Sequence, residues 1–115
     1  MRILYGVQGT GNGHITRARV MLPALQAAGC KVDFVFSGRP ANAYFDMAMF
    51  GDYRAFQGFS FYTKQGAVNW FKTISDARPL RFIKDVSALN VKDYDLVLTD
   101  FEPVSAWAAK LRGVP

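Results

Sequence analysis

The sequence predicts an α/β fold in which helices cover both faces of a Rossmann-like parallel sheet. Residues 3–7 and 94–99 are short, mostly apolar runs, as expected of strands that a sheet buries on both faces. Stretches with helical spacing of apolar residues alternate with such runs, which indicates βαβ units. The chain has 115 residues, half of them hydrophobic, so it is long enough for one domain with a substantial core.

The first predicted unit places a glycine-rich turn between a strand and a helix. Residues 3–7 form the strand, and residues 8–13 form a turn that holds three glycines. A helix is expected over residues 14–28, with Gly29 as its C-cap. Pro23 lies inside this helix and predicts a kink or a break, because proline has no N–H to donate.

The middle of the chain predicts two further strands joined by a helix. Residues 31–36 form the second strand, and Pro40 is well placed to open a helix that runs to about residue 50. Residues 53–57 form a shorter third strand.

An insertion separates the third strand from the fourth. Residues 59–63 and 67–70 flank the tripeptide 64–66, a pattern typical of a β-hairpin with a three-residue loop. Residues 71–89 then predict a helix that Pro79 interrupts.

The last predicted unit completes the sheet. The fourth strand, residues 94–99, leads into a helix that Pro103 opens and Gly113 ends. Right-handed crossovers place the strands in the order 3-2-1-4. The carboxyl ends of the first and fourth strands then flank the point where the winding reverses, which is where such sheets bind ligands. Residues 113–115 resemble the lead into a further strand, so we expect an N-terminal fragment of a larger protein.

The glycine turn is the first candidate binding site. It lies before a predicted helix N-terminus, whose free N–H groups and partial positive charge suit a phosphate. A tight turn without a ligand is the alternative interpretation. The turn consists of Gly9, Thr10, Gly11, Asn12 and Gly13.

The nicotinamide-binding fingerprint does not fit this turn. The third small residue of G-x-G-x-x-G would fall on His14 or Thr16, depending on the starting glycine. The acidic residue expected after the second strand is Ser37 instead. Ser37 and Arg39 could still hold a 2′-phosphate, so an NADP-binding Rossmann domain of an oxidoreductase stays open as an alternative.

His14 and Asp100 form the candidate catalytic pair. His14, the only histidine, lies where the glycine turn meets the helix, and Asp100 follows the neighbouring strand at the same end of the sheet. The carboxylate would fix the imidazole tautomer and stabilise the imidazolium, while the other ring nitrogen takes a proton from a substrate. The alternative interpretation of Asp100 is an N-cap of the helix opened by Pro103.

Three further residues lie near the predicted mouth of the site. Arg17 and Arg39 flank it and could meet an acidic acceptor, although solvated positions fit equally well. Glu102, the only glutamate, either caps the final helix or touches a substrate hydroxyl.

Composition excludes several classes of protein. The net charge of +5 is spread along the chain with no run of three basic residues, so we expect a mildly basic surface and no nucleic-acid partner. The single cysteine, Cys30, excludes an internal disulfide and a cysteine-rich metal site. No apolar run reaches the ~18 residues that a transmembrane helix needs. A cytoplasmic location fits these features.

Two stretches resemble signatures of GT-B glycosyltransferases. The first is Gly-Asn-Gly-His at 11–14 with the helix after it and residues 29–34, and the second is residues 95–101 with Gly-Val-Pro at 113–115. Both are similar to the UDP-glucuronosyltransferase-like group and to the bacterial N-acetylglucosaminyltransferase that makes lipid II. Residues 37–39 and the hairpin resemble a prokaryotic glycosyltransferase subgroup, and the resemblance covers the whole chain.

The resemblance implies the N-terminal, acceptor-side half of a GT-B fold over residues 1–115, without the C-terminal nucleotide-sugar domain. It implies transfer of a sugar from a nucleotide diphosphosugar, such as a UDP-sugar, to a hydroxyl, with inversion. The family's general base falls on His14, its partner on Asp100, and the loop that faces the donor diphosphate on residues 9–13. No cofactor is expected, because these enzymes need no metal bound by an Asp-x-Asp motif. Thr16 and Arg17 stand where many members carry a proline.

The expected partner is a small-molecule, lipid or polysaccharide acceptor. Peripheral contact with the inner face of the membrane stays open, as does a non-catalytic module that binds a nucleotide sugar or a polysaccharide. We expect residues 1–115 alone to be inactive. We also expect them to self-associate, because the fourth strand would present an uncovered edge.

Overall fold

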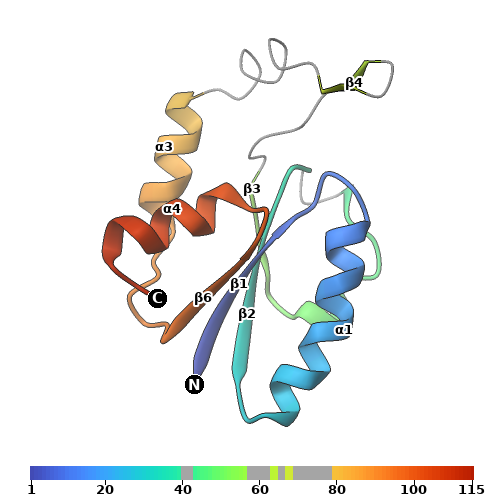
Figure 1. Ribbon diagram of the computed structural model, residues 1–115, viewed down its shortest axis with the longest axis vertical. Helices are drawn as coiled ribbons and strands as arrows, with labels where there is room; N and C mark the ends of the chain where they lie inside the picture. The colour runs from blue at the N-terminus through green and yellow to red at the C-terminus, as the bar shows by residue number, and fades with distance from the viewer. Residues whose placement is uncertain (40–42, 57–62, 65–66, 69–78) are drawn as a thin grey trace.

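The computed structural model describes residues 1–39, 43–56, 63–64, 67–68 and 79–115 (Figure 1). Its elements in chain order are β1 (Arg2–Gln8), α1 (Gly13–Ala27), β2 (Lys31–Ser37), η2 (Ala48–Phe50), β3 (Arg54–Phe56), β4 (Thr63–Lys64), β5 (Ala67–Val68), α3 (Pro79–Ala88), β6 (Leu96–Asp100) and α4 (Pro103–Arg112).

The main sheet has four parallel strands in the order β3-β2-β1-β6. This order confirms the predicted 3-2-1-4, with β6 as the fourth strand. β1 lies between two strands and is buried along almost its whole length, which explains its continuous apolar sequence. The register pairs Val7 with Asp100, so the carboxyl ends of β1 and β6 lie side by side.

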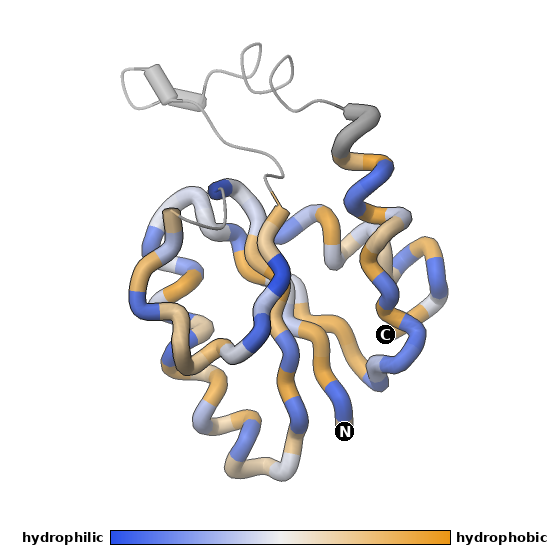
Figure 2. Tube along the Cα trace, turned by 180° about the vertical axis from the view of Figure 1, so that it is seen from behind, coloured by the Kyte–Doolittle hydropathy of each residue, from blue (hydrophilic) through white to orange (hydrophobic). Residues whose placement is uncertain are grey.

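Helices cover both faces of this sheet, α1 on one face and α3 with α4 on the other (Figure 1). Successive residues of β1 and β2 face opposite sides, so two separate cores form. Figure 2 shows hydrophobic colour along the centre of the sheet. The core under α1 includes Tyr5, Val7, Ile15, Leu22, Phe34 and Phe36, and the core under α3 and α4 includes Leu4, Val35, Val86, Leu89, Val91 and Val104.

The predicted ends of α1 and α4 are confirmed. Gly29 follows α1 with φ +86°, and the N–H of Cys30 donates back to the Leu25 carbonyl at 3.0 Å. Gly113 ends α4 with φ +68°. Both glycines occupy the left-handed region, which side chains other than glycine rarely adopt.

α1 continues through Pro23, so the expected break at this residue is wrong. Proline removes the hydrogen bond to the carbonyl one turn earlier, that of Arg19. Pro23 lies on the exposed side of the helix, where water can reach the backbone around it.

The expected helix from Pro40 to residue 50 is also wrong over its described part. Asp46 has φ +55°, which no α-helix contains, and only η2 follows it as a single 3₁₀ turn. Tyr44, Met47 and Phe50 recur every third residue and are buried in the core under α1. The gain from burying three large side chains outweighs the helical preference of the segment.

The insertion contains an antiparallel pair, β4 and β5, and in this the hairpin prediction is confirmed. Lys64 was expected in the loop but pairs with Ala67, which leaves two residues between the strands, the commonest hairpin connection. The rest of the predicted hairpin and residues 71–78 lie outside the described residues. α3 is described from Pro79 onward, so the predicted interruption of a helix at this residue stays a prediction.

The fourth strand is shifted by two residues at its start and one at its end. β6 begins at Leu96; just before it, the Tyr94 hydroxyl donates to Asp33 at 2.7 Å and the Asp95 carboxylate accepts from the backbone N–H of Arg2 at 2.8 Å. On the outer edge of β6, the Val97 N–H donates to the Pro115 carbonyl at 2.7 Å. Among the described helices, none is long and apolar enough to cross a lipid bilayer.

Candidate functional site

The candidate site lies at the carboxyl edge of the sheet, between the end of β6 and the start of α1. β1 is too uniformly apolar to remain in water, and the glycine turn that follows it reverses the chain into α1. The register between Val7 and Asp100 then fixes which residue of β6 stands beside the turn. Two residues 86 positions apart, His14 and Asp100, meet here.

His14 and Asp100 are in direct contact, as the strand order predicts. The His14 Nδ1 lies 2.8 Å from the Asp100 Oδ1, with the two side chains 34% and 13% exposed. An ionised carboxylate only accepts hydrogen bonds, so the imidazole donates from Nδ1 and leaves the lone pair on Nε2. Among the described residues, no hydrogen bond to Nε2 is present. The arrangement can therefore orient an imidazole to accept a proton.

Asp100 is also held by Arg17, which the sequence placed only at the mouth of the site. One guanidinium nitrogen of Arg17 donates to Oδ1 at 2.9 Å and to Oδ2 at 3.0 Å. Arg17 and His14 share one side of the first turn of α1, because residues three apart on a helix are neighbours. Asp100 does not cap α4, so that alternative interpretation is wrong.

Phe101 is a site residue that the sequence analysis missed. Its ring stacks on the His14 imidazole with centroids 6.1 Å apart and planes 7° apart, and the residue is 62% exposed. Its φ of +57° is unusual for a bulky residue and costs on the order of 1–2 kcal/mol. Neither spacing nor composition signals such a backbone, so the sequence offered no way to find it.

The glycine turn leaves the start of α1 open. A side-chain carbon on Gly11 or Gly13 would meet nothing within 4 Å. No side chain caps α1, and its first turn holds no acidic residue. Gly9 differs, because a Cβ there would overlap the Tyr44 ring and hydroxyl. The turn is therefore packed at its first glycine and accessible at the next two.

Other residues of the turn stabilise its shape. The Thr10 backbone N–H and hydroxyl donate to the Gln8 Oε1 at 3.3 and 3.0 Å. The Asn12 Oδ1 accepts from Arg39 at 2.7 Å, which ties the turn to the end of β2.

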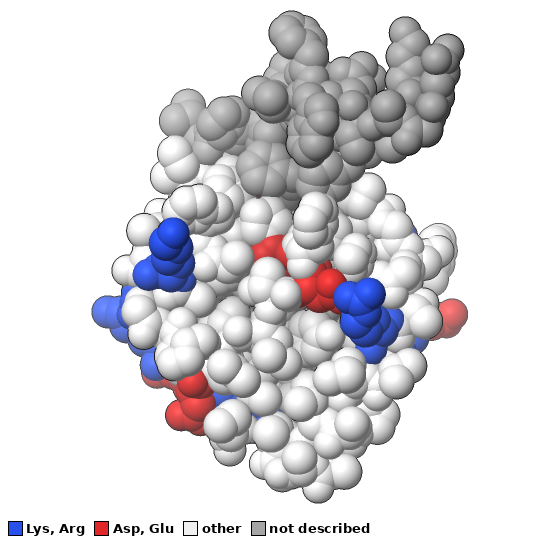
Figure 3. All heavy atoms as spheres, viewed as in Figure 1, with Lys and Arg blue, Asp and Glu red and all other residues white. Residues whose placement is uncertain are grey.

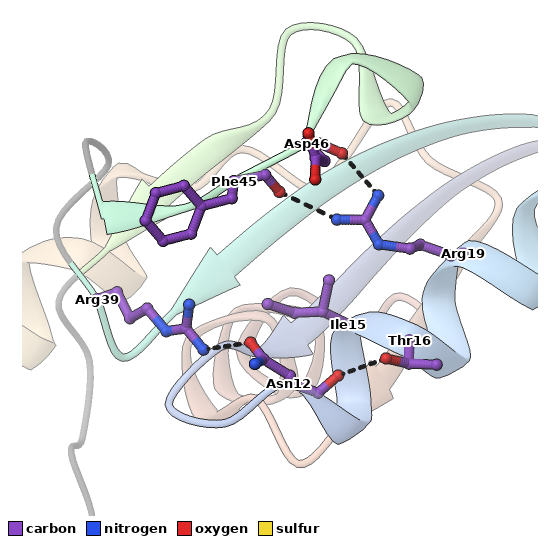
Figure 4. Close-up of a pocket in the computed structure, with 7 residues that line it drawn as sticks. All are labelled: Asn12, Ile15, Thr16, Arg19, Arg39, Phe45 and Asp46. Carbon is purple, nitrogen blue, oxygen red and sulfur yellow. Dashed lines mark hydrogen bonds between the residues drawn. The ribbon is translucent and has the colours of Figure 1, made fainter.

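A hollow of about 290 Å³ is lined by Ile15, Thr16 and Arg19 of α1 (Figure 4). Asp100 contacts His14 and Arg17, on another side of the same helix. Arg19 and Arg39 lie on opposite sides of Ile15 in this view. Arg19 donates to the main-chain carbonyls of Phe45 at 3.1 Å and Asp46 at 2.6 Å. Two guanidinium groups in one hollow suit an anionic or polyhydroxylated ligand. Arg39 thus lines this hollow rather than the His14–Asp100 pair, and its acceptor-side role stays a prediction.

Burial raises the pKa of two tyrosine hydroxyls next to the site. For Tyr5 burial is the main cause, the Asp100 carboxylate adds to it, and Arg17 opposes it. Burial also raises the pKa of Tyr44 to about 12, although the Arg39 backbone near its hydroxyl acts in the opposite direction. Both hydroxyls are therefore neutral at physiological pH.

Glu102 is a buried cap, which corrects its expected acceptor-side position. It is 0% exposed, and its carboxylate accepts from the backbone N–H groups of Val104 and Ser105 at 2.8 and 2.6 Å. The Ser37 hydroxyl donates to the same carboxylate at 2.6 Å. Gly6 makes room for this arrangement, because a Cβ there would overlap the Ser105 side chain.

The same contact removes the support for an NADP site. Ser37 is fully buried, and its hydroxyl is engaged by Glu102, so it cannot meet a 2′-phosphate. Arg39, the other proposed ligand, is directed to Asn12 instead.

Among the described residues, no group of three His, Cys, Asp or Glu side chains is close enough to hold a metal ion. Asp93, Tyr94 and Asp95 spell an Asp-x-Asp pattern that the sequence analysis passed over. They precede β6 at the opposite end of the sheet from His14. The absence of a required cofactor stays a prediction.

Charge is sparse on the face of the molecule that Figure 3 shows. Figure 3 shows a mostly uncharged face on which basic side chains lie at separate places rather than in one patch. The net charge of +5 therefore gives no extended basic surface on this face.

Comparison with known proteins supports one family and one fold. A family model described as glycosyl transferase family 1 matches residues 1–115. The crystal structure of MurG from Acinetobacter baumannii matches with a TM-score of 0.55 and 16% identity over 99% of this chain. No curated protein matches the sequence. This chain spans 33% of the length of that MurG chain.

Proposed function

Because the chain belongs to glycosyl transferase family 1, and its fold is that of an N-terminal GT-B domain, we propose that it carries the acceptor-activating groups of a glycosyltransferase. The proposed reaction moves a sugar from a nucleotide diphosphosugar to a hydroxyl of the acceptor. The 2.8 Å contact between His14 and Asp100, beside an accessible glycine turn, is the observation that carries this proposal.

In the proposed step, the His14 Nε2 takes the proton of the acceptor hydroxyl while its oxygen bonds to the anomeric carbon. The bond between that carbon and the diphosphate oxygen breaks, and the nucleoside diphosphate leaves with the electron pair. A single displacement of this kind inverts the anomeric configuration. Asp100 stabilises the imidazolium that forms.

The glycine turn is the place where the leaving diphosphate would bind. Gly11 and Gly13 leave the backbone uncovered, and the first turn of α1 has neither a side-chain cap nor an acidic residue. The partial positive charge of a helix N-terminus stabilises negative charge that develops on a leaving group. No metal takes part in this proposal, and a second domain would hold most of the nucleotide.

The proposal describes the acceptor only by its chemical class. The hollow beside Arg39 lies on another side of α1 from His14, so it would hold a polyhydroxylated or anionic part of the acceptor remote from the reacting hydroxyl. A small-molecule, lipid or polysaccharide acceptor fits this description. A cytoplasmic enzyme in peripheral contact with the membrane would reach a lipid acceptor. Residues 1–115 alone would be inactive, since most of the donor site lies elsewhere. They would also self-associate along the outer edge of β6 beyond the Val97–Pro115 hydrogen bond.

A transfer assay tests the proposal. The full-length protein is incubated with isotopically labelled nucleotide diphosphosugars and a panel of hydroxyl acceptors, and the anomeric configuration of the product is read by NMR. We expect labelled product of inverted configuration. Binding of the nucleotide sugar without transfer to any acceptor or to water would support a non-catalytic module and overturn the proposal.

A further inference from the structure

We propose that Arg17 is a positioning residue that locks the Asp100 carboxylate and thereby keeps His14 in the tautomer that can act as a base. This inference rests on the proposed function, and it assigns Arg17 to the catalytic pair rather than to the acceptor. It starts from one observation: a single guanidinium nitrogen bonds both oxygens of Asp100, at 2.9 and 3.0 Å.

The first step of the argument is orientation. A carboxylate held through one oxygen can rotate, whereas contacts to both oxygens fix its plane. Oδ1 is shared by Arg17 and the His14 Nδ1, so the lock also fixes the direction of the hydrogen bond to the imidazole. Asp100 is 13% exposed, so little water reaches its carboxylate, although the Arg17 side chain itself is 61% exposed.

The second step concerns the proton on the imidazole. Arg17 can only donate hydrogen bonds, and the carboxylate that it binds can only accept them. His14 must therefore donate from Nδ1, and the lone pair stays on Nε2. Without the lock, the carboxylate can turn toward water, and the preference for the Nδ1–H tautomer weakens.

The third step concerns charge around His14. Arg17 from α1 and Asp100 from β6 face the imidazole with opposite charges, and the Tyr5 hydroxyl of β1 is neutral because burial raises its pKa. Glu102 is turned away from the site into its own hydrogen bonds with α4 and Ser37. The guanidinium thus balances the charge of the one carboxylate that contacts the imidazole.

Arg17 differs in this respect from the other arginines near the site. Arg19 and Arg39 donate to carbonyl oxygens and to the Asn12 side chain around the hollow, and neither is paired with a carboxylate of a described residue. Arg17 is directed away from that hollow, toward β6. A role in holding an anionic acceptor fits Arg39 better than Arg17.

The test replaces Arg17 by methionine, which keeps the length of the side chain and removes the lock. Residues 1–115 contain one histidine, so selective ¹⁵N labelling of histidine gives one pair of imidazole signals from this region, identified by their loss in His14→Gln. We expect mainly the Nδ1–H tautomer in the neutral wild-type imidazole and a shift toward Nε2–H in Arg17→Met. Arg54→Met is the matched control, since Arg54 lies over the Phe56 ring on β3 and should leave the tautomer unchanged.

Kinetics of the full-length protein give the second readout. We expect Arg17→Met to lower kcat about 10- to 100-fold, the range typical of groups that orient a functional histidine, with little change in the KM of the acceptor. Arg17→Lys retains the charge, so it should recover part of kcat and also covers the case in which the methionine variant does not fold.

The outcomes separate the two proposals. A wild-type tautomer in Arg17→Met, or a raised acceptor KM with unchanged kcat, would overturn the positioning role. A tautomer shift in a protein that transfers no sugar would support the positioning role and overturn the proposed function instead.

Discussion

Each end of the central sheet carries a cluster in which an arginine and an aspartate meet a ring. The amino-end cluster consists of Arg2, Asp33 and Tyr94. The carboxyl-end cluster consists of Arg17, Asp100 and His14. The two clusters contain similar residue types. They differ in whether every hydrogen-bonding atom of the ring is already engaged.

In the amino-end cluster the polar group of the ring is already engaged. The Tyr94 hydroxyl donates its one proton to Asp33 at 2.7 Å, and the Arg2 guanidinium covers the Tyr94 ring at 5.0 Å. In the carboxyl-end cluster the His14 Nε2 is unengaged among the described residues, and accessible glycines lie next to it. A charged cluster alone therefore does not mark a site, whereas unused hydrogen-bonding capacity beside open backbone does.

The largest expected difference between the clusters is catalytic. Asp100→Asn should lower kcat roughly 10²-fold, because the imidazolium loses its counter-charge. Asp33→Asn should leave kcat within about twofold and cost about 0.5–1.5 kcal/mol of unfolding free energy, the net value of one hydrogen bond. Steady-state kinetics and denaturant unfolding of both variants measure the two quantities. Equal kcat losses in the two variants would contradict the assignment of catalysis to the carboxyl-end cluster alone.

A second prediction compares a tightly packed glycine with an accessible one at the carboxyl end of the sheet. Gly6→Ala should lower the unfolding free energy by about 1–3 kcal/mol, because the new methyl group overlaps the buried Ser105. Gly11→Ala meets open space and should stay within about 0.5 kcal/mol of wild type. Urea unfolding gives both values. A Gly11 variant as unstable as the Gly6 variant would show that the turn is packed rather than accessible.

The smallest expected effect is a pH dependence at the amino end. Burial, followed by the hydrogen bond to Asp33, raises the pKa of Tyr94 from its ordinary 10.0 to about 12. Between these values the folded state keeps a proton that the unfolded state loses, so this stabilisation is complete below about pH 10 and declines as the pH rises toward 12. Tyr94→Phe should therefore lose less stability over that range than wild type in parallel unfolding curves. Parallel declines in both proteins would argue against a shifted hydroxyl.

The sequence predicts the fold well where the burial of apolar residues permits only one arrangement of the chain. The apolar runs of β1 and β2 and the glycines after α1 and α4 lead directly to the observed order of elements. Prediction fails where long-range packing overrides local preference. Tyr44, Met47 and Phe50 enter the core through an irregular loop instead of a helix, and the backbone of Asp46 follows from that packing.

The candidate site divides in the same way. The pairing of His14 with Asp100 follows from strand order, which the sequence predicts. The lock by Arg17 and the backbone of Phe101 depend on side-chain directions that no spacing rule gives. Glu102 was found as a cap, but its full burial requires the close approach of α4 to Gly6 across the sheet.

The most direct test of the account is the kcat of His14→Ala in the full-length protein with a nucleotide diphosphosugar and a hydroxyl acceptor. We expect kcat to fall on the order of 10²–10⁴-fold while the KM of the donor changes little, because a general base acts on the chemical step. A near-normal kcat would place the base elsewhere and leave His14, like Tyr94 at the other end of the sheet, as a structural residue.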